Sequence, residues 1–96
     1  MTFDWDPRKA QSNLKKHGVS FTEATTVFLD PLALTFDDPD HSADEQRLIT
    51  IGSSSAGRVL VAAHADSGEK VRIISARRAT RKESHGYQEG DFQAQR

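Results

Sequence analysis

Three short apolar runs follow one another in the second half of the chain, at residues 46–52, 58–65 and 71–76. They are rich in β-branched residues, and turn-forming segments at 53–57 and 66–70 separate them. Links this short allow hairpins, but they are too short for the crossover of a dozen or more residues that parallel neighbours need. The pattern therefore predicts an antiparallel meander.

The first helix has a clear start and a clear end. Asp6 is a good N-cap residue, and Pro7 suits the first helical turn because its missing N–H is not needed there. Gly18 provides a C-terminal stop. We therefore expect a helix over residues 7–17.

Two further helices are predicted to begin at capping boxes. Residues 20–23 read S-x-x-E and predict a helix over 21–29, which Pro31 ends. Residues 80–83 read T-x-x-E and predict a short terminal helix. Two glycines weaken this last helix, so we expect residues 89–96 to be a frayed tail.

With 96 residues the chain is expected to form a single domain over 1–88, of the α+β class. Strands 3–5 and 32–36 are predicted to join the meander in one antiparallel sheet. Helices 7–17 and 21–29 would pack on a single face, leaving the other face for function. Six large side chains are expected to fill the core: Trp5, Phe21, Phe28, Ile51, Val61 and Ile73.

Composition argues against several classes of function. There is no cysteine, so disulfides and thiolate metal sites are excluded. The four histidines show no H-x-x-x-H pairing, and the acidic loop at 38–44 departs from a calcium loop at its sixth and twelfth positions. No glycine-rich phosphate loop is present. We therefore expect neither a metal nor a cofactor.

No apolar run reaches the ~18–20 residues of a membrane-spanning helix, and the first residues do not resemble a secretory signal. The sequence thus predicts a cytoplasmic protein that does not bind membranes. His64 alternates with apolar residues of a predicted strand, so we expect a hydrogen-bonded sheet residue there. His17 lies in the last turn of the first helix, where a cation offsets the helix dipole.

The net charge of −1 conceals a strong segregation of charge. Residues 37–45 hold five acids and no base, whereas residues 70–82 hold six bases and no acid. Strand alternation over 71–77 predicts that Arg72 and Arg77 leave opposite faces of the sheet. A guanidinium over an open sheet face suits phosphate oxygens. A solvated charge run at a strand end is the alternative reading.

Several segments occur in a distinctive order: F-D-W-D-P at 3–7, N-x-x-K-H-G-V-S-F at 13–21, R-I-I-S-A-R at 72–77 and T-x-x-E at 80–83, followed by Tyr87. Over about residues 3–88, this order resembles the BrnT family of toxins. The resemblance implies a RelE-like fold and a metal-independent endoribonuclease that inhibits translation. In such chemistry the ribose 2′-hydroxyl attacks its own phosphate, leaving a cyclic phosphate and a 5′-hydroxyl.

This chemistry needs a base, an acid and fixed cations around the phosphate. The expected cations are Arg77 and Arg72, with Lys9 and Arg47 behind them. The candidates for proton transfer are Glu83, Tyr87 and His17.

The resemblance also implies a partner, the ribbon-helix-helix antitoxin BrnA, in an assembly of two toxins and two antitoxins. Operator DNA would be bound only through the antitoxin. Two alternatives stay open: an inactive homologue that acts as a binding module, and a component of an autoregulatory repressor.

Overall fold

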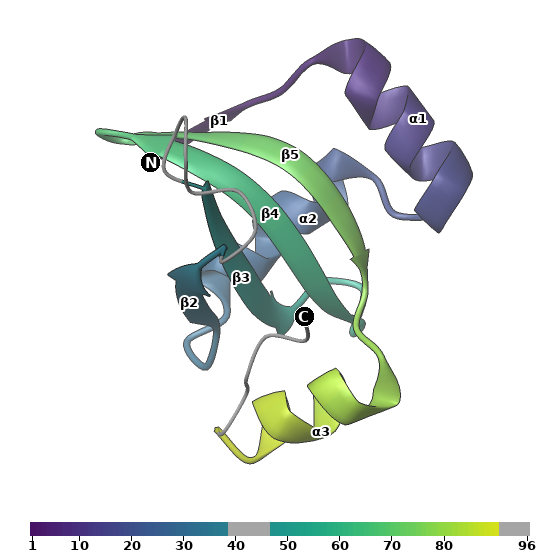
Figure 1. Ribbon diagram of the computed structural model, residues 1–96, viewed down its shortest axis with the longest axis vertical. Coiled ribbons are helices and arrows are strands. Elements are labelled where there is room, and N and C mark those ends of the chain that lie inside the picture. Colours follow the sequence, from purple (N-terminus) through teal and green to yellow (C-terminus); the bar gives the residue numbers. More distant parts are fainter. Residues whose placement is uncertain (39–46, 91–96) are drawn as a thin grey trace.

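The computed structural model describes residues 1–38 and 47–90 (Figure 1). In chain order the elements are β1 (Thr2–Asp4), α1 (Pro7–His17), α2 (Phe21–Thr25), the 3-10 helix η1 (Thr26–Leu29), β2 (Leu34–Asp37), β3 (Arg47–Ser53), β4 (Val59–Ser67), β5 (Lys70–Arg78) and α3 (Arg81–Gln88). The α+β class is therefore confirmed. The predicted acidic loop from residue 39, and the predicted tail from residue 91, lie outside the described residues.

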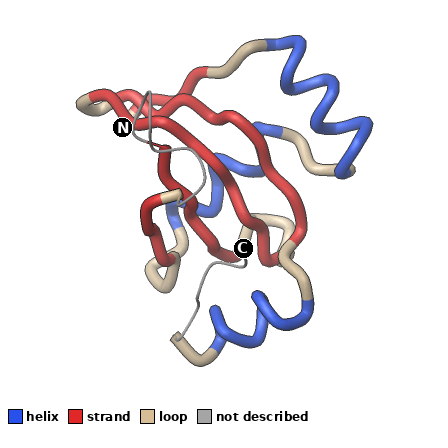
Figure 2. The backbone as a smooth tube through the Cα atoms, in the orientation of Figure 1, coloured by secondary structure: helices blue, strands red, loops and turns tan. Residues whose placement is uncertain are grey.

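The strands form one sheet in the order β1-β5-β4-β3-β2 (Figure 2). Strands β2 to β5 pair antiparallel, as the short links predict. However, β1 lies beside β5 and runs parallel to it, so the prediction of a wholly antiparallel sheet is wrong for the first strand. The argument from short links holds only for strands that are neighbours in sequence. Most of the chain separates β1 from β5, which leaves ample length for a parallel crossover.

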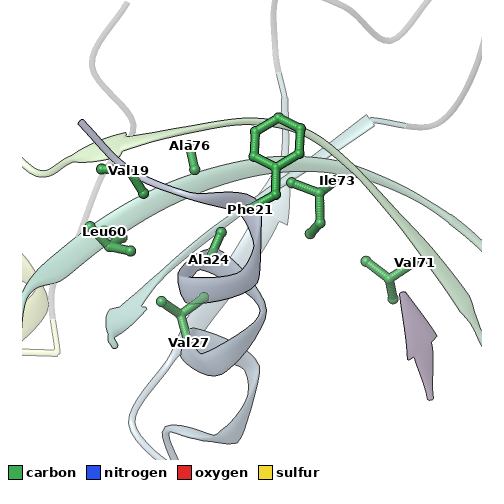
Figure 3. Close-up of a cluster of buried hydrophobic side chains, with 8 residues drawn as sticks. All are labelled: Val19, Phe21, Ala24, Val27, Leu60, Val71, Ile73 and Ala76. Atoms are coloured by element: carbon green, nitrogen blue, oxygen red, sulfur yellow. The ribbon is translucent and has the colours of Figure 1, made fainter. Parts of the chain in front are cut away.

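The core lies between the sheet and the α2–η1 segment. Figure 3 shows side chains of this segment facing those of β4 and β5. The buried cluster consists of Val19, Phe21, Ala24, Val27, Leu60, Val71, Ile73 and Ala76. Of the six predicted core residues, Phe21 and Ile73 belong to this cluster, and Trp5 and Phe28 pack against it from partly buried positions. Ile51 and Val61 are buried as predicted but lie outside the cluster. Burial of these side chains is the main source of the sheet's stability.

Helix α1 begins and ends as its sequence predicts. The Asp6 carboxylate accepts a hydrogen bond from the Arg8 N–H at 2.8 Å. At the other end Gly18 adopts a left-handed conformation, with φ of 68°, and its N–H donates to the Leu14 carbonyl at 2.8 Å. A side chain at this φ would be strained, so a glycine here gives the sharp stop.

Asn13 attaches α1 to the outer side of β5. Its amide N–H groups donate to the carbonyls of Ala76 (2.8 Å) and Val19 (3.0 Å), and its amide oxygen accepts from the Ala76 N–H (3.1 Å). Strand β1 covers β5 only from Lys70 to Arg72. The Asn13 amide therefore binds the backbone of β5 beyond the end of β1, much as another strand would.

The second helix differs from the prediction of one helix over 21–29. It is α-helical only to Thr25 and continues as a 3-10 turn. The hydroxyls of Thr25 and Thr26 donate to carbonyls three residues earlier, at 2.7 and 2.6 Å. Such local bonds compete with the regular α-helical pattern.

The following strand starts two residues later than predicted, at Leu34. The Asp30 carboxylate accepts from the Leu32 N–H at 2.9 Å, and the Asp30 carbonyl accepts from the Ala33 N–H at 3.0 Å. These bonds hold the chain in a turn before β2.

The turn between β3 and β4 is fastened to α2 through Glu23. Its carboxylate accepts from Arg58 Nε at 3.0 Å and from the Ser54 hydroxyl at 2.7 Å. The bond to Arg58 is the main reason why the pKa of Glu23 is lowered. In the S-x-x-E box only the Glu23 N–H bonds to the Ser20 hydroxyl. The Glu23 carboxylate binds Ser54 and Arg58 of the β3–β4 hairpin instead of the Ser20 backbone. Ser54 has a structural role in this turn.

A chain of polar side chains crosses three strands on the core face. The Thr35 and Thr50 hydroxyls are 2.7 Å apart, Thr50 Oγ1 is 2.8 Å from His64 Nε2, and His64 Nδ1 is 2.6 Å from Asp66 Oδ1. His64 is only 1% exposed and packs edge-on against the Phe28 ring. The prediction of a hydrogen-bonded sheet histidine is confirmed.

Candidate active site

A β-bulge in β5 decides where its arginines point. The pairing with β4 passes from Ala63–Ser75 directly to His64–Ile73, so Ile74 is the extra residue. Val71, Ile73 and Ala76 consequently all belong to the buried cluster. A regular strand would have sent Ala76 to the opposite face from Ile73.

Arg72 and Arg77 each follow a core-facing residue of β5. Both therefore project from the face opposite the buried cluster, which we call the open face. Beside Arg77 this face is covered, because its register partner Val61 and the next residue across the sheet, Ile51, are both buried. The prediction that they leave opposite faces is wrong, because strand alternation cannot anticipate the bulge. The bulge brings the two predicted cations onto one surface.

One group on the open face is a row across four strands. Arg72 pairs with Asp4 on one side and with Ala65 on the other, and Ala65 in turn pairs with Arg47. Directly paired residues point to the same face of a sheet, so Arg72 and Arg47 share the open face. One strand lies between them, so their backbones are about 10 Å apart, which is two strand spacings. Arg72 is exposed and Arg47 is half-buried. We call this group the arginine row.

The second group is Arg77 with Glu83, the third residue of α3. Arg77 Nη1 and Nη2 donate to the two carboxylate oxygens of Glu83 at 2.7 and 2.9 Å. Glu83 is 2% exposed, whereas the Arg77 side chain is 41% exposed. Hydrogen bonding to Arg77 lowers the pKa of Glu83, which is therefore ionised at neutral pH. The capping box with Thr80 is complete and holds Glu83 in place.

The two groups lie at different positions along β5. Arg72 and Arg77 are five positions apart in the sequence, which corresponds to about 15 Å along a strand. The structure therefore places three predicted cations on one face but does not gather them around a single point. An extended polyanion, rather than a small anion, fits cations spaced in this way.

Lys9 and His17 lie on α1, four residues before and four after Asn13. This spacing puts all three on one stripe of the helix. Asn13 binds the backbone of Ala76, next to Arg77, so the stripe runs along the edge of β5. Lys9 is exposed and His17 is half-buried.

Tyr87 faces Asp30 at the end of η1. Its hydroxyl donates to Asp30 Oδ2, which also accepts from the Ser53 N–H at 2.8 Å. Burial, followed by the bond to Asp30, raises the pKa of Tyr87 to about 12. At neutral pH Tyr87 is thus a proton donor. Asp30 is not among the predicted site residues, and no sequence signal links it to a tyrosine 57 residues away.

The Tyr87 contact predicts a loss of stability at high pH. The pKa of about 12 lies above the ordinary value of 10.0, so the contribution of Tyr87 is complete below pH 10 and is lost as the pH rises to 12. Thermal unfolding measured across this interval is expected to show a steeper fall of Tm for the natural chain than for Tyr87→Phe. Parallel falls of Tm in the two proteins would contradict this role.

Among the described residues, no three His, Asp or Glu side chains lie together in a way that suits a metal ion. The described part of the chain likewise contains no helix with the length and apolar composition to cross a membrane.

Residues 5–83 match the model of the family described as ribonuclease toxin, BrnT, of type II toxin-antitoxin system. The chain belongs to this family. The matched region contains six of the seven candidate residues, the exception being Tyr87.

This BrnT family member is also similar in structure to the ribonuclease toxin BrnT of Brucella abortus. The two share 28% sequence identity, with a TM-score of 0.66 over 84% of this chain and 99% of the other. A search of curated proteins finds no match. The substrate of a ribonuclease is RNA, and RNA carries phosphates, which are groups that arginine side chains bind.

Proposed function

We propose that this BrnT family member is a metal-independent endoribonuclease with a RelE-like fold, and that RNA lies across the open face. The single observation that supports this most is the bulge at Ile74, which puts Arg77 on the same face as the arginine row. Without an extra residue in β5, Arg77 would point toward the core. RNA cleavage by the free toxin would inhibit translation and growth.

In the proposed reaction the ribose 2′-hydroxyl attacks the adjacent phosphorus and the 5′-oxygen leaves. The products are a 2′,3′-cyclic phosphate and a 5′-hydroxyl end. Arg77 stabilises the charge that develops on the phosphoryl oxygens, while Arg72 and Arg47 bind neighbouring phosphates. Lys9 adds a further cation from α1.

Glu83 is the positioning residue for Arg77. Its two oxygens occupy one side of the guanidinium fork and fix the orientation of that group. Nη1 also donates to the Arg78 carbonyl at 3.3 Å. The Nε–H and the second Nη2 N–H of this 41% exposed side chain are the groups that we assign to a phosphate. A cation fixed before the substrate arrives needs no reorganisation during the reaction.

The proton-transfer roles follow from protonation states. Tyr87 is protonated at neutral pH and is the candidate acid, a role in which its hydroxyl exchanges the bond to Asp30 for one to the leaving oxygen. Glu83 is ionised but already holds Arg77, which leaves His17, on the stripe beside Asn13, as the candidate base.

The family is that of type II toxin-antitoxin systems, so an antitoxin partner is expected. We propose a BrnA-like ribbon-helix-helix antitoxin in an assembly of two toxins and two antitoxins, which covers the open face. Operator DNA would be bound through the antitoxin, because a chain of net charge −1 has little long-range attraction for duplex DNA.

The proposed reaction predicts RNA cleavage in excess EDTA. The purified chain, incubated with end-labelled RNA, is expected to give products with cyclic-phosphate and 5′-hydroxyl ends. The same RNA with 2′-O-methyl groups is the control and should stay intact, because the attacking hydroxyl is blocked. Cleavage that stops in EDTA and returns with magnesium would contradict the mechanism. Intact RNA from a chain that still binds its antitoxin would favour the inactive binding module.

A further inference from the structure

Helix α1 carries a shallow groove on the side that faces away from β5. The groove has a volume of about 590 Å³ and is lined by Arg8, Gln11, Ser12, Leu14 and Lys15. Asn13 and Ala10, which pack inward, lie on the opposite side of the helix. Figure 1 shows α1 standing at one side of the sheet, so this face of the helix looks outward. We call it the α1 groove.

The charge of α1 is entirely positive. Its eleven residues include four Lys or Arg and no Asp or Glu. Arg8 and Lys15 are seven residues apart, about 10 Å along the helix axis, so they reach different phosphates of one strand. Between them Leu14 is 52% exposed and offers an apolar surface within a cationic setting.

We propose that the α1 groove binds single-stranded RNA, separately from the arginines of the open face. This inference rests on the proposed function, in which RNA is the substrate. Arg8 and Lys15 bind phosphates, Gln11 and Ser12 hydrogen-bond to phosphates or bases, and an unstacked base lies on Leu14. The α1 groove would thus supply affinity, while the open face supplies the chemistry.

The side chains of the groove favour RNA over a protein partner. The centres of protein–protein interfaces are enriched in aromatic residues and depleted of lysine. The groove has one leucine, two cations and two uncharged polar side chains, and the last four are of the types that contact phosphates and sugars. The two cations favour a polyanion, and the exposed leucine favours one that also presents the flat faces of unstacked bases.

The test measures binding of a fully 2′-O-methylated single-stranded RNA by fluorescence anisotropy over a range of salt concentrations. Arg8→Gln/Lys15→Gln is expected to raise Kd about tenfold or more and to lower the log–log salt slope by about 1.4, from two lost phosphate contacts. Leu14→Ala should raise Kd severalfold without changing this slope. The matched control is Arg81→Gln/Lys82→Gln, which removes the same charge from exposed positions of α3 and should change Kd far less.

Three results would overturn the proposal. One is an equal loss of binding in the α1 and α3 variants, which indicates a general effect of net charge. Another is unchanged binding by the folded α1 variant. The third is RNA binding that persists while the antitoxin complex is lost, which assigns the groove to a protein partner.

Cleavage of unmodified RNA separates this proposal from the proposed function. The α1 variant should show a raised KM and an unchanged kcat if both proposals hold. A natural chain that binds methylated RNA through α1 but does not cleave RNA would contradict the proposed function alone. If the natural chain cleaves RNA and the α1 variant binds methylated RNA as tightly as the natural chain does, only the proposal that the α1 groove binds RNA would be contradicted.

Discussion

Replacing Arg77 by alanine is expected to lower the rate of RNA cleavage by at least about a hundredfold and to abolish growth inhibition. Its guanidinium is held on the open face by two hydrogen bonds that it donates to Glu83, and its side chain stays 41% exposed. Loss of a fixed cation removes stabilisation of the charge that develops in the transition state. The measurements are single-turnover cleavage of a defined RNA and growth after induced expression.

The matched control is Arg78→Ala, which removes an exposed arginine from the adjacent position and should change the cleavage rate only slightly. Because Arg77→Ala leaves the buried Glu83 carboxylate without this partner, circular dichroism must show that the variant is folded. If it unfolds, Arg77→Ala/Glu83→Gln removes the buried charge and keeps the test valid. A folded variant that cleaves RNA at the natural rate would eliminate Arg77 from the catalytic machinery.

Replacing Asn13 by alanine is expected to lower the free energy of unfolding by about 3 kcal/mol. The change removes three hydrogen bonds at once. The buried N–H and carbonyl of Ala76 and the carbonyl of Val19 then lose the Asn13 amide as their partner. Each such group costs about 1 kcal/mol or more when it is left without a partner. Urea unfolding followed by circular dichroism measures the difference.

Two further variants make this experiment specific. Ser12→Ala changes the neighbouring exposed position and should alter stability by no more than about 0.5 kcal/mol. Asn13→Asp keeps an acceptor for the Ala76 N–H but places a carboxylate beside two carbonyls, so it should be as destabilising as alanine at neutral pH. A loss below about 1 kcal/mol in Asn13→Ala would show that α1 is held by other contacts.

The local parts of the fold were predictable because their signals act over a few residues. Asp6 and Gly18 mark the ends of α1, and Thr80 with Glu83 marks the start of α3, each through bonds within one helical turn. The meander was predictable because its links are too short for any other pairing. The core was predictable because the six residues are aromatic or β-branched, which are types that folded proteins mostly bury.

The predictions that were wrong concern features that depend on residues far apart in the sequence. The direction of β1 is set by its pairing with β5, and the bulge at Ile74 by the fit of β5 against β4. Arg72 and Arg77 can be picked out in the sequence as candidate cations. They project from the same face only because pairing with β4 creates the bulge between them. The same holds for Tyr87, whose partner Asp30 lies on a different element.

The polar chain from Thr35 to Asp66 also limits the ways in which the sheet can be misassembled. Sliding β4 by one residue against β3 would turn His64 to the opposite face, so that its imidazole and the Thr50 hydroxyl would lose their mutual hydrogen bond. Each buried polar group left in this state costs roughly 1–3 kcal/mol. A slipped alignment is therefore penalised even where Val, Ile and Ala side chains pack almost equally well. The buried His64 imidazole thus adds to the cost of a slipped alignment of β3 and β4.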